Sequence, residues 1–209
     1  MTGFLTEIDE QPAALRATLA ALKPQMEALG DWQHRLWDGS LRRVILSGMG
    51  ASYNATIPAQ LHLIQHGIDA RSIEASELLH YQLPIVTDDT LVILVSQSGR
   101  SVEIVKLLDA LDKKTPVIGL TNNDDNPLAK QSAVHLQIQA GSEATVSSKT
   151  YTCSLAAMHL LVRTLTGEQT GSSFERLYAL ADAMEAALDG WKQQAEQIVA
   201  QIAGSQTIV

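Results

Sequence analysis

Serine hydroxyls gather at one point in the sequence, where an apolar run ends in Ser96-Gln97-Ser98-Gly99-Arg100-Ser101. We call residues 96–101 the serine loop. The apolar run 91–95 predicts a buried strand, and the spacing of the apolar residues after Ser101 predicts a helix. The first turn of a helix carries unpaired N–H groups and partial positive charge, which favour a bound anion. The serine loop is therefore predicted to bind phosphate.

Two further predicted strands, residues 44–46 and 134–138, are also followed by turns rich in small and hydroxyl residues. The first turn reads Ser47-Gly48-Met49-Gly50-Ala51-Ser52, and the second covers residues 140–150. The carboxyl ends of parallel strands lie at one edge of a sheet, and ligands bind there. We therefore expect Ser52 and the second turn to converge with the serine loop.

Other chemistries that these patterns could support lack a required residue. Gly48 and Gly50 begin a dinucleotide-binding pattern, but its third glycine is replaced by Tyr53. The P-loop lysine is missing, and Ser96 and Ser98 lack the Gly-x-Ser-x-Gly context of a hydrolase nucleophile. We therefore expect no cofactor, and we expect the serines to bind a ligand without attacking it.

Histidine and cysteine residues are interpreted as structural. His62 and His66 lie four residues apart on a predicted helix, which is the spacing of metal ligands, but the sequence offers no evident third ligand. We therefore predict no metal site. His135 in a strand and His159 in a helix are expected to pack structurally. Cys153 lies in an apolar segment, which favours a buried, structural thiol. It is the single cysteine in the sequence, which excludes an internal disulfide and fits a reducing cytoplasm.

Alternating apolar runs and helical patterns predict the fold class. Five short apolar runs, separated by helical segments, are expected to form a parallel sheet with helices on both faces; they cover residues 44–46, 70–73, 91–95, 116–120 and 134–138. The prediction is a three-layer α/β/α domain. A chain of 209 residues is long enough for one such domain with helical appendages.

Helical segments flank this domain on both sides. Residues 7–29 have the spacing of an amphipathic helix, and apolar residues recur at alternating intervals of four and three from 177 to 202. The second pattern predicts a long helix that packs on its own domain or forms a seam with a partner. We divide the chain into an N-terminal helical segment (1–30), the α/β domain (31–168) and a C-terminal helix (169–209). Residues 204–209 resemble a turn and the beginning of a further strand, as if a second unit opened there.

The charge balance excludes some partners. The chain has 15 Lys and Arg residues against 23 Asp and Glu residues, a net charge of −8. A surface that binds nucleic acid needs clustered basic residues, so we expect no nucleic-acid partner. No signal peptide or membrane-spanning segment is visible, and we expect a cytoplasmic protein without a membrane partner.

At these residues the chain resembles the sugar isomerase (SIS) domain family, and within it the glucosamine-6-phosphate synthase branch. The resemblance covers roughly residues 7–165. It is carried by four blocks in the family's order and spacing: Glu10-Gln11-Pro12, Gly50-Ala51-Ser52-Tyr53, Ser96-Gln97-Ser98-Gly99, and Glu143 with residues 146–149.

The resemblance implies a bound sugar phosphate and assigns residues to it. The phosphate would be held by Ser52, Ser96, Gln97, Ser98 and Ser101. Gly50, Val146 and Ser148 would lie near the sugar, with Ser147 as the alternative to Ser148 because the segment is one residue shorter than the family pattern.

The resemblance also implies an amino-sugar phosphate isomerase or deaminase, hence an enzyme at the family level. The family's general base, ring-opening histidine and Schiff-base lysine lie in or after a second SIS half, so no catalytic residue is assigned in this chain. The expected partner is a second SIS unit or a second copy of the chain. A non-catalytic phosphosugar sensor is the alternative function.

Overall fold

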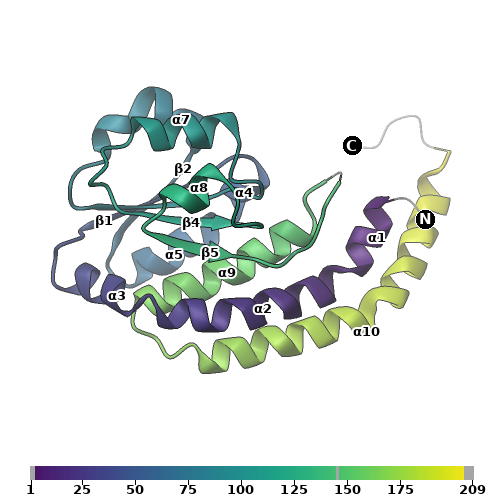
Figure 1. Cartoon of the computed structure of the whole chain (residues 1–209). Helices are drawn as coiled ribbons and strands as arrows, with labels where there is room; N and C mark the ends of the chain where they lie inside the picture. Colours follow the sequence, from purple (N-terminus) through teal and green to yellow (C-terminus); the bar gives the residue numbers. More distant parts are fainter. Residues whose placement is uncertain (1–2, 145, 205–209) are drawn as a thin grey trace.

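The computed structural model describes residues 3–144 and 146–204 and contains a parallel β-sheet (Figure 1). Within the described residues the sheet has five strands in the order β2-β1-β3-β4-β5, all parallel. The strands are β1 (Arg43–Gly48), β2 (Asp69–Glu74), β3 (Thr90–Val95), β4 (Val117–Thr121) and β5 (Val134–Gln137). The predicted five-stranded parallel sheet is confirmed.

Strand β3 lies at the centre of the sheet and is buried along its whole length. It pairs with β1 on one side and with β4 on the other. A strand covered on both faces needs apolar residues at every position, which explains why 91–95 read as an uninterrupted apolar run. Because β1 and β3 end side by side at Gly48 and Val95, the loops that follow them lie next to each other.

Helices cover both faces of the sheet, and the sheet separates two cores. One core lies under α2 (Gln11–Glu27), α3 (Gly30–Trp37), α5 (Ile57–Gln65) and α9 (Lys149–Leu165). The other lies under α6 (Ala75–Glu77), η1 (Leu78–Gln82), α7 (Val102–Ala110) and α8 (Pro127–Gln131). Successive strand residues alternate between them: Leu91 and Ile93 enter the first core, and Val92 and Leu94 the second.

Two helices expected to be continuous are split. The predicted helix 7–29 is divided into α1 (Gly3–Asp9) and α2, and the predicted helix after Ser52 is divided into α4 (Ala51–Asn54) and α5. Pro12 and Pro58 stand in the first turn of the second helix in each case. Proline has no N–H to bond to the preceding turn, so it starts a helix more easily than it continues one.

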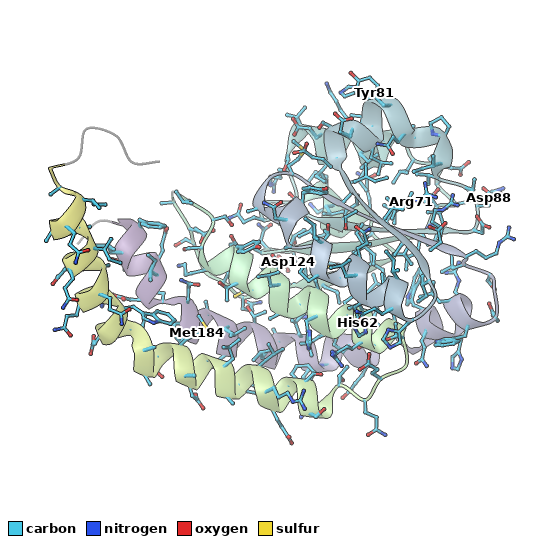
Figure 2. The ribbon with its side chains drawn as sticks, turned by 180° about the vertical axis from the view of Figure 1, so that it is seen from behind. His62, Arg71, Tyr81, Asp88, Asp124 and Met184 are labelled. Atoms are coloured by element: carbon cyan, nitrogen blue, oxygen red, sulfur yellow. The ribbon has the colours of Figure 1, made fainter. Side chains whose placement is uncertain are left out.

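Helix α10 (Gly171–Ile202) runs along α2 on the outside of the domain (Figures 1 and 2). Its Met184 packs against the first core. Its first half buries Phe174 and Ala181 in the first core, and Arg16 of α2 pairs with Asp182 at 2.7 Å. Its far half leaves apolar side chains in solvent. The first half thus packs on its own domain, as one of the two expectations had it.

Two features complete the fold. The short helix η2 (Leu83–Ile85) precedes β3. The strand expected near the C-terminus falls on residues 205–209, which lie outside the described residues.

No helix in the described part of the chain combines the length and the apolar character that crossing a bilayer would need.

Candidate functional site

A cavity of about 250 Å³ lies where the loops after β1, β3 and β5 meet. Described residues that line it are Met49, Ala51, Ser52, Gln97, Glu143, Ser147 and Thr150. The structure thus brings Ser52 and Gln97 together with the turn at 140–150, although these segments are far apart in the sequence. We call this space the loop cavity.

The serine loop is held in shape by its own hydroxyl groups. Ser96 is buried, and its Oγ lies 3.1 Å from the Oγ of Ser101 and accepts a hydrogen bond of 3.1 Å from the N–H of Gly99. The Oγ of Ser98 accepts the N–H of Arg100 at 3.2 Å. Ser96 and Ser101 therefore fix the curve of the loop, whereas the half-buried Ser98 and the exposed Gln97 retain access to solvent.

A buried asparagine supports the serine loop from below. Gly99 has a φ of +63°, and a Cβ placed there would lie 1.9 Å from the Oδ1 of Asn126. Asn126 accepts the N–H of Ala129 at 2.8 Å as the N-cap of α8, and its amide donates to the Oγ1 of Thr121 at 3.2 Å. A residue with a Cβ would collide with Asn126, so the contact with the N-cap of α8 requires glycine at position 99.

His135 belongs to the same support. Its Nε2 lies 2.8 Å from the Oγ1 of Thr121, and burial lowers the pKa of its imidazole against the opposing charge of Asp124. The structural role expected for His135 agrees with this contact.

The N-terminus of α7 opens onto the serine loop without a side-chain cap. Ser101 is its N-cap residue, but the hydroxyl bonds to Ser96 and not to a helix N–H. No side chain in the described part of the chain caps the N–H groups of the first turn, so they and the positive end of the helix dipole are available to a ligand. This is the arrangement that binds phosphate groups in many proteins.

The N-terminus of α9, by contrast, is capped by a carboxylate. The Oε1 of Glu143 accepts the N–H groups of Ser148 at 2.8 Å and Lys149 at 2.7 Å, and its Oε2 accepts the hydroxyl of Thr150. Burial opposes the charge of Glu143, but these hydrogen bonds outweigh it and lower its pKa. Glu143 therefore stays ionised, and its charge occupies this helix end.

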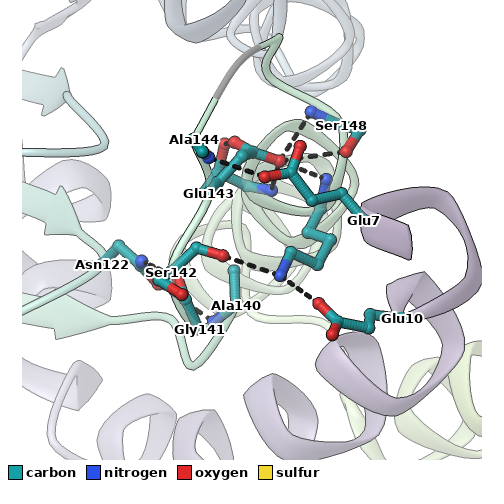
Figure 3. Close-up of polar contacts among 11 residues, drawn as sticks. Glu7, Glu10, Asn122, Ala140, Gly141, Ser142, Glu143, Ala144 and Ser148 are labelled. Atoms are coloured by element: carbon teal, nitrogen blue, oxygen red, sulfur yellow. Dashed lines mark hydrogen bonds and ion pairs between the residues drawn. The ribbon is translucent and has the colours of Figure 1, made fainter. Parts of the chain in front are cut away.

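A buried lysine ties the first helices to the turn after β5 (Figure 3). The Nζ of Lys149 contacts the Oε2 of Glu10 at 2.5 Å and donates to the carbonyl of Ser142 at 2.8 Å. Glu7 accepts the N–H of Ala144 at 2.6 Å. The network fixes one wall of the loop cavity.

The Glu-Gln-Pro block acquires a physical role from these contacts. Glu10 pairs with Lys149, Gln11 accepts the hydroxyl of Thr152 at 2.7 Å, and Pro12 starts α2. The block therefore anchors the N-terminal helices to α9. Glu7 and this anchoring were not evident from the sequence, because no local pattern pairs residues so far apart.

The residues assigned to the sugar occupy different positions. Ser147 lines the loop cavity and its Oγ lies 2.8 Å from the Oγ1 of Thr150, whereas the hydroxyl of Ser148 donates to Glu143 at 3.0 Å. Val146 is 62% exposed, and Gly50 is exposed at a φ of +53°. Both stand on loops that border the cavity.

Cys153 lies in α9 and is fully buried. Burial raises the pKa of its thiol to about 11. It remains protonated at neutral pH and does not act as a nucleophile, in agreement with the structural role expected for it.

Comparison with known proteins identifies relatives. The sequence profile of the family described as "SIS domain" matches residues 40–163. Glutamine–fructose-6-phosphate aminotransferase [isomerizing] 1 of Arabidopsis thaliana is 32% identical over 189 residues, which cover 85% of this chain and 28% of that protein. The chain spans about a third or less of the length of such curated relatives.

Solved structures share the fold. The C-terminal domain of glucosamine-fructose-6-phosphate aminotransferase from Francisella tularensis superposes with a TM-score of 0.77 at 23% identity, covering 98% of this chain and 60% of that one. A Bacteroides fragilis protein provisionally described as a phosphosugar isomerase involved in capsule formation superposes with a TM-score of 0.68 at 22% identity, covering 83% of this chain and 95% of that one. A chain close to the length of one such domain therefore occurs among solved structures.

Proposed function

The chain belongs to the SIS domain family, and from that premise we propose that it binds a sugar phosphate in the loop cavity. The phosphate is held by Ser52, Ser96, Gln97, Ser98 and Ser101 together with the first N–H groups of α7. The sugar lies toward Gly50, Val146 and the adjacent serines Ser147 and Ser148. The observation that carries the proposal is the uncapped N-terminus of α7 beside a cavity lined by Ser52 and Gln97.

Charge supports the placement of the phosphate at α7 and not at α9. Both helices begin at the carboxyl edge of the sheet. Glu143 occupies the start of α9 as an anion, and a phosphate there would meet like charge. Among the described residues no carboxylate caps the start of α7, although Glu103 lies in its first turn, and the hydroxyl groups beside this start donate to phosphate oxygens.

We place this domain in an amino-sugar or ketohexose 6-phosphate isomerase or deaminase, paired with a second SIS unit. Aldose–ketose interconversion needs a base with a pKa near neutrality. Glu143 is the one carboxylate among the described residues that line the loop cavity, and hydrogen bonding lowers its pKa. Glu143 is thus a poor proton shuttle, which supports a binding domain (31–168) that receives its base from another unit.

The same observation favours a second candidate function. A phosphosugar sensor needs the residues that bind the phosphate and does not need a general base. An ionised, fully hydrogen-bonded Glu143 serves such a protein as a structural cap.

Calorimetry with fructose 6-phosphate and glucosamine 6-phosphate tests the binding proposal. The unphosphorylated sugars should bind far more weakly. Ser98→Ala should weaken binding by about 1–2 kcal/mol, roughly 5- to 30-fold, because one hydrogen bond to a charged phosphate is lost. Ser172→Ala, which removes an exposed hydroxyl from the start of α10, is the matched control and should bind as the wild type does. Equal affinity of Ser98→Ala and wild type would contradict the phosphate assignment.

An ammonia-release assay with glucosamine 6-phosphate tests the catalytic arrangement. The purified 209-residue chain should bind the sugar without turnover. Restored turnover on addition of a second SIS unit would identify a paired enzyme, and binding with no turnover in either case would identify a sensor. Turnover by the chain alone would overturn the paired arrangement.

A further inference from the structure

Three metal-ligating side chains meet at the far end of α9 from the loop cavity. His62 and His66 come from the end of α5, and Glu168 comes from the turn between α9 and α10. One ligand atom of each lies within 4.8 Å of the other two. The Oε1 of Glu168 lies 2.8 Å from the Nε2 of His62 and 3.4 Å from the Nε2 of His66. Figure 2 shows His62 beside this turn.

The first helix end holds His66 in place. His66 is the C-cap of α5, and the N–H of Ile68 donates to the carbonyl of Leu63 at 3.1 Å while that of Gly67 donates to Ile64 at 2.9 Å. This pair of bonds is a Schellman motif, in which the residue after the cap takes a left-handed conformation. Gly67 does so with a φ of +79°.

The second helix end holds Glu168 by the same device. The N–H of Glu168 donates to the carbonyl of Arg163 at 2.9 Å, and Gly167, with a φ of +79°, donates to Thr164 at 3.1 Å. The guanidinium of Arg163 also binds the Oε2 of Glu168. The carboxylate is therefore oriented with Oε2 toward Arg163 and Oε1 toward the two imidazoles.

The histidine rings are prepared to act as ligands. The Nδ1 of His66 lies 2.9 Å from the carbonyl oxygen of His62, which can only accept a hydrogen bond. In the neutral ring the proton therefore sits on Nδ1, and the lone pair of Nε2 faces Glu168. A backbone carbonyl commonly orients a metal-bound histidine in this way. The Nε2 of His62 faces the same carboxylate oxygen of Glu168 as the Nε2 of His66 does.

We propose that His62, His66 and Glu168 bind one divalent transition-metal ion of the zinc type. Two imidazoles and one carboxylate suit this class of ion. Ligand atoms about 2.0–2.2 Å from a tetrahedral zinc ion stand about 3.4 Å from one another. Here the Oε1 of Glu168 lies 2.8 and 3.4 Å from the two histidine nitrogens, and all three ligand atoms lie within 4.8 Å of one another. Three protein ligands leave the fourth position to water.

The site is independent of the sugar-phosphate proposal. The 17 residues of α9, about 25 Å of helix, separate it from the loop cavity. A bound ion would join the end of α5 to the turn that leads into α10, so its effect is expected on stability and not on sugar binding. Failure of the metal site would leave the loop cavity unaffected.

Titration of the untagged, chelator-treated chain with Zn²⁺ by calorimetry tests the proposal. We expect one equivalent of Zn²⁺ to bind and the melting temperature to rise. His66→Gln and Glu168→Gln should each weaken binding at least about tenfold, as loss of a ligand does. His80→Gln, which removes an exposed histidine elsewhere, is the matched control and should bind as the wild type does.

Cobalt supplies a readout that does not depend on the variants. Co²⁺ in this site should give the intense visible bands of a four-coordinate ion, and one equivalent of Zn²⁺ should abolish them. Absence of Zn²⁺ binding by the wild type, or equal affinity of the wild type and both ligand variants, would overturn the proposal and leave His62 and Glu168 as a polar contact without a metal. Cys153 does not compete for the ion, because its thiol is buried and protonated.

Discussion

Gly99 shows how a single residue determines the shape of the serine loop. Its left-handed φ of +63° is strained for any other residue, and a Cβ would collide with Asn126. Gly99→Ala should therefore lower the free energy of unfolding by about 2–4 kcal/mol, from backbone strain and steric overlap together. Urea denaturation monitored by circular dichroism measures the loss.

Gly39→Ala separates the two causes. Gly39 has a φ of +82°, but no atom lies within 4 Å of the Cβ that it would gain. This variant should lose only the cost of the left-handed conformation, about 1 kcal/mol. A loss at Gly99→Ala no larger than that at Gly39→Ala would mean that Asn126 moves aside and does not define the loop.

Residues whose role depends on their neighbours in sequence could be predicted, and those paired through the fold could not. The serines of the serine loop follow a strand and precede a helix, so phosphate binding could be proposed for them from the local pattern. The ligand spacing of His62 and His66 is also visible in the local pattern, but the sequence prediction there is no metal site. Glu168 and Asn126 meet their partners only after the chain has folded, and nothing in their own surroundings indicates it.

Helix α9 depends on Glu143 at its N-terminus. Glu143→Gln should lower the free energy of unfolding by about 1–2 kcal/mol, because a neutral amide accepts the N–H groups of Ser148 and Lys149 less well and lacks the charge that favours the helix dipole. Thermal and urea denaturation measure the difference. Glu175→Gln, at an exposed position on α10, should have little effect.

The contribution of Glu143 should also depend on pH. Its pKa in the folded chain is lowered from the usual 4.5. A carboxylate with a lowered pKa stabilises the fold above its unfolded value, and this stabilisation is lost as the pH falls through the folded value. The difference between wild type and Glu143→Gln should therefore be constant from pH 7 to about 5 and shrink below pH 4.5. A difference that grew on acidification would contradict the assignment of Glu143 as an ionised cap.

Elements were predicted well where a short apolar run ended in polar turns, and poorly where a proline interrupted an amphipathic pattern. Each of the five strands was found within one or two residues of its expected bounds, because each apolar run is too short for a helix and is bounded by polar turns. The amphipathic pattern of 7–29 continues across Glu10, whereas the backbone does not, since the pattern records burial and not the missing N–H of Pro12. Period alone therefore merged α1 with α2.

For the whole molecule, the order of the layers could be predicted, but what covers the apolar face of α10 could not. Alternating strands and helices imply a parallel sheet between two helical layers, and the structure has this order. The apolar spacing from 177 to 202 is the same along the whole helix, yet only its first half is covered by α2. A repeated pattern shows which face is apolar and does not show what covers it.

The far half of α10 carries exposed apolar side chains that we expect to join two copies of the chain. Trp191 is 53% exposed and Ile198 is 56% exposed. Helix α1, which carries the exposed Phe4, lies beside this far half of α10 (Figure 1), and Asp9 at its end pairs with Lys192 at 2.9 Å. Apolar side chains gathered in this way favour association, because burial removes them from water. We expect the chain to form dimers whose dissociation can be followed by sedimentation equilibrium.

A charge placed on this face should separate the subunits. Ile198→Glu should weaken association by at least about tenfold, since burying an unpaired carboxylate costs more than the 1.4 kcal/mol that a tenfold change requires. Gln193→Glu adds the same charge to an exposed position on the opposite side of α10 from Trp191, and it is expected to change association much less. A wild-type chain that stays monomeric at every concentration, or equal effects of the two variants, would show that this face does not join two copies, and a second SIS unit would then be the partner to test on it.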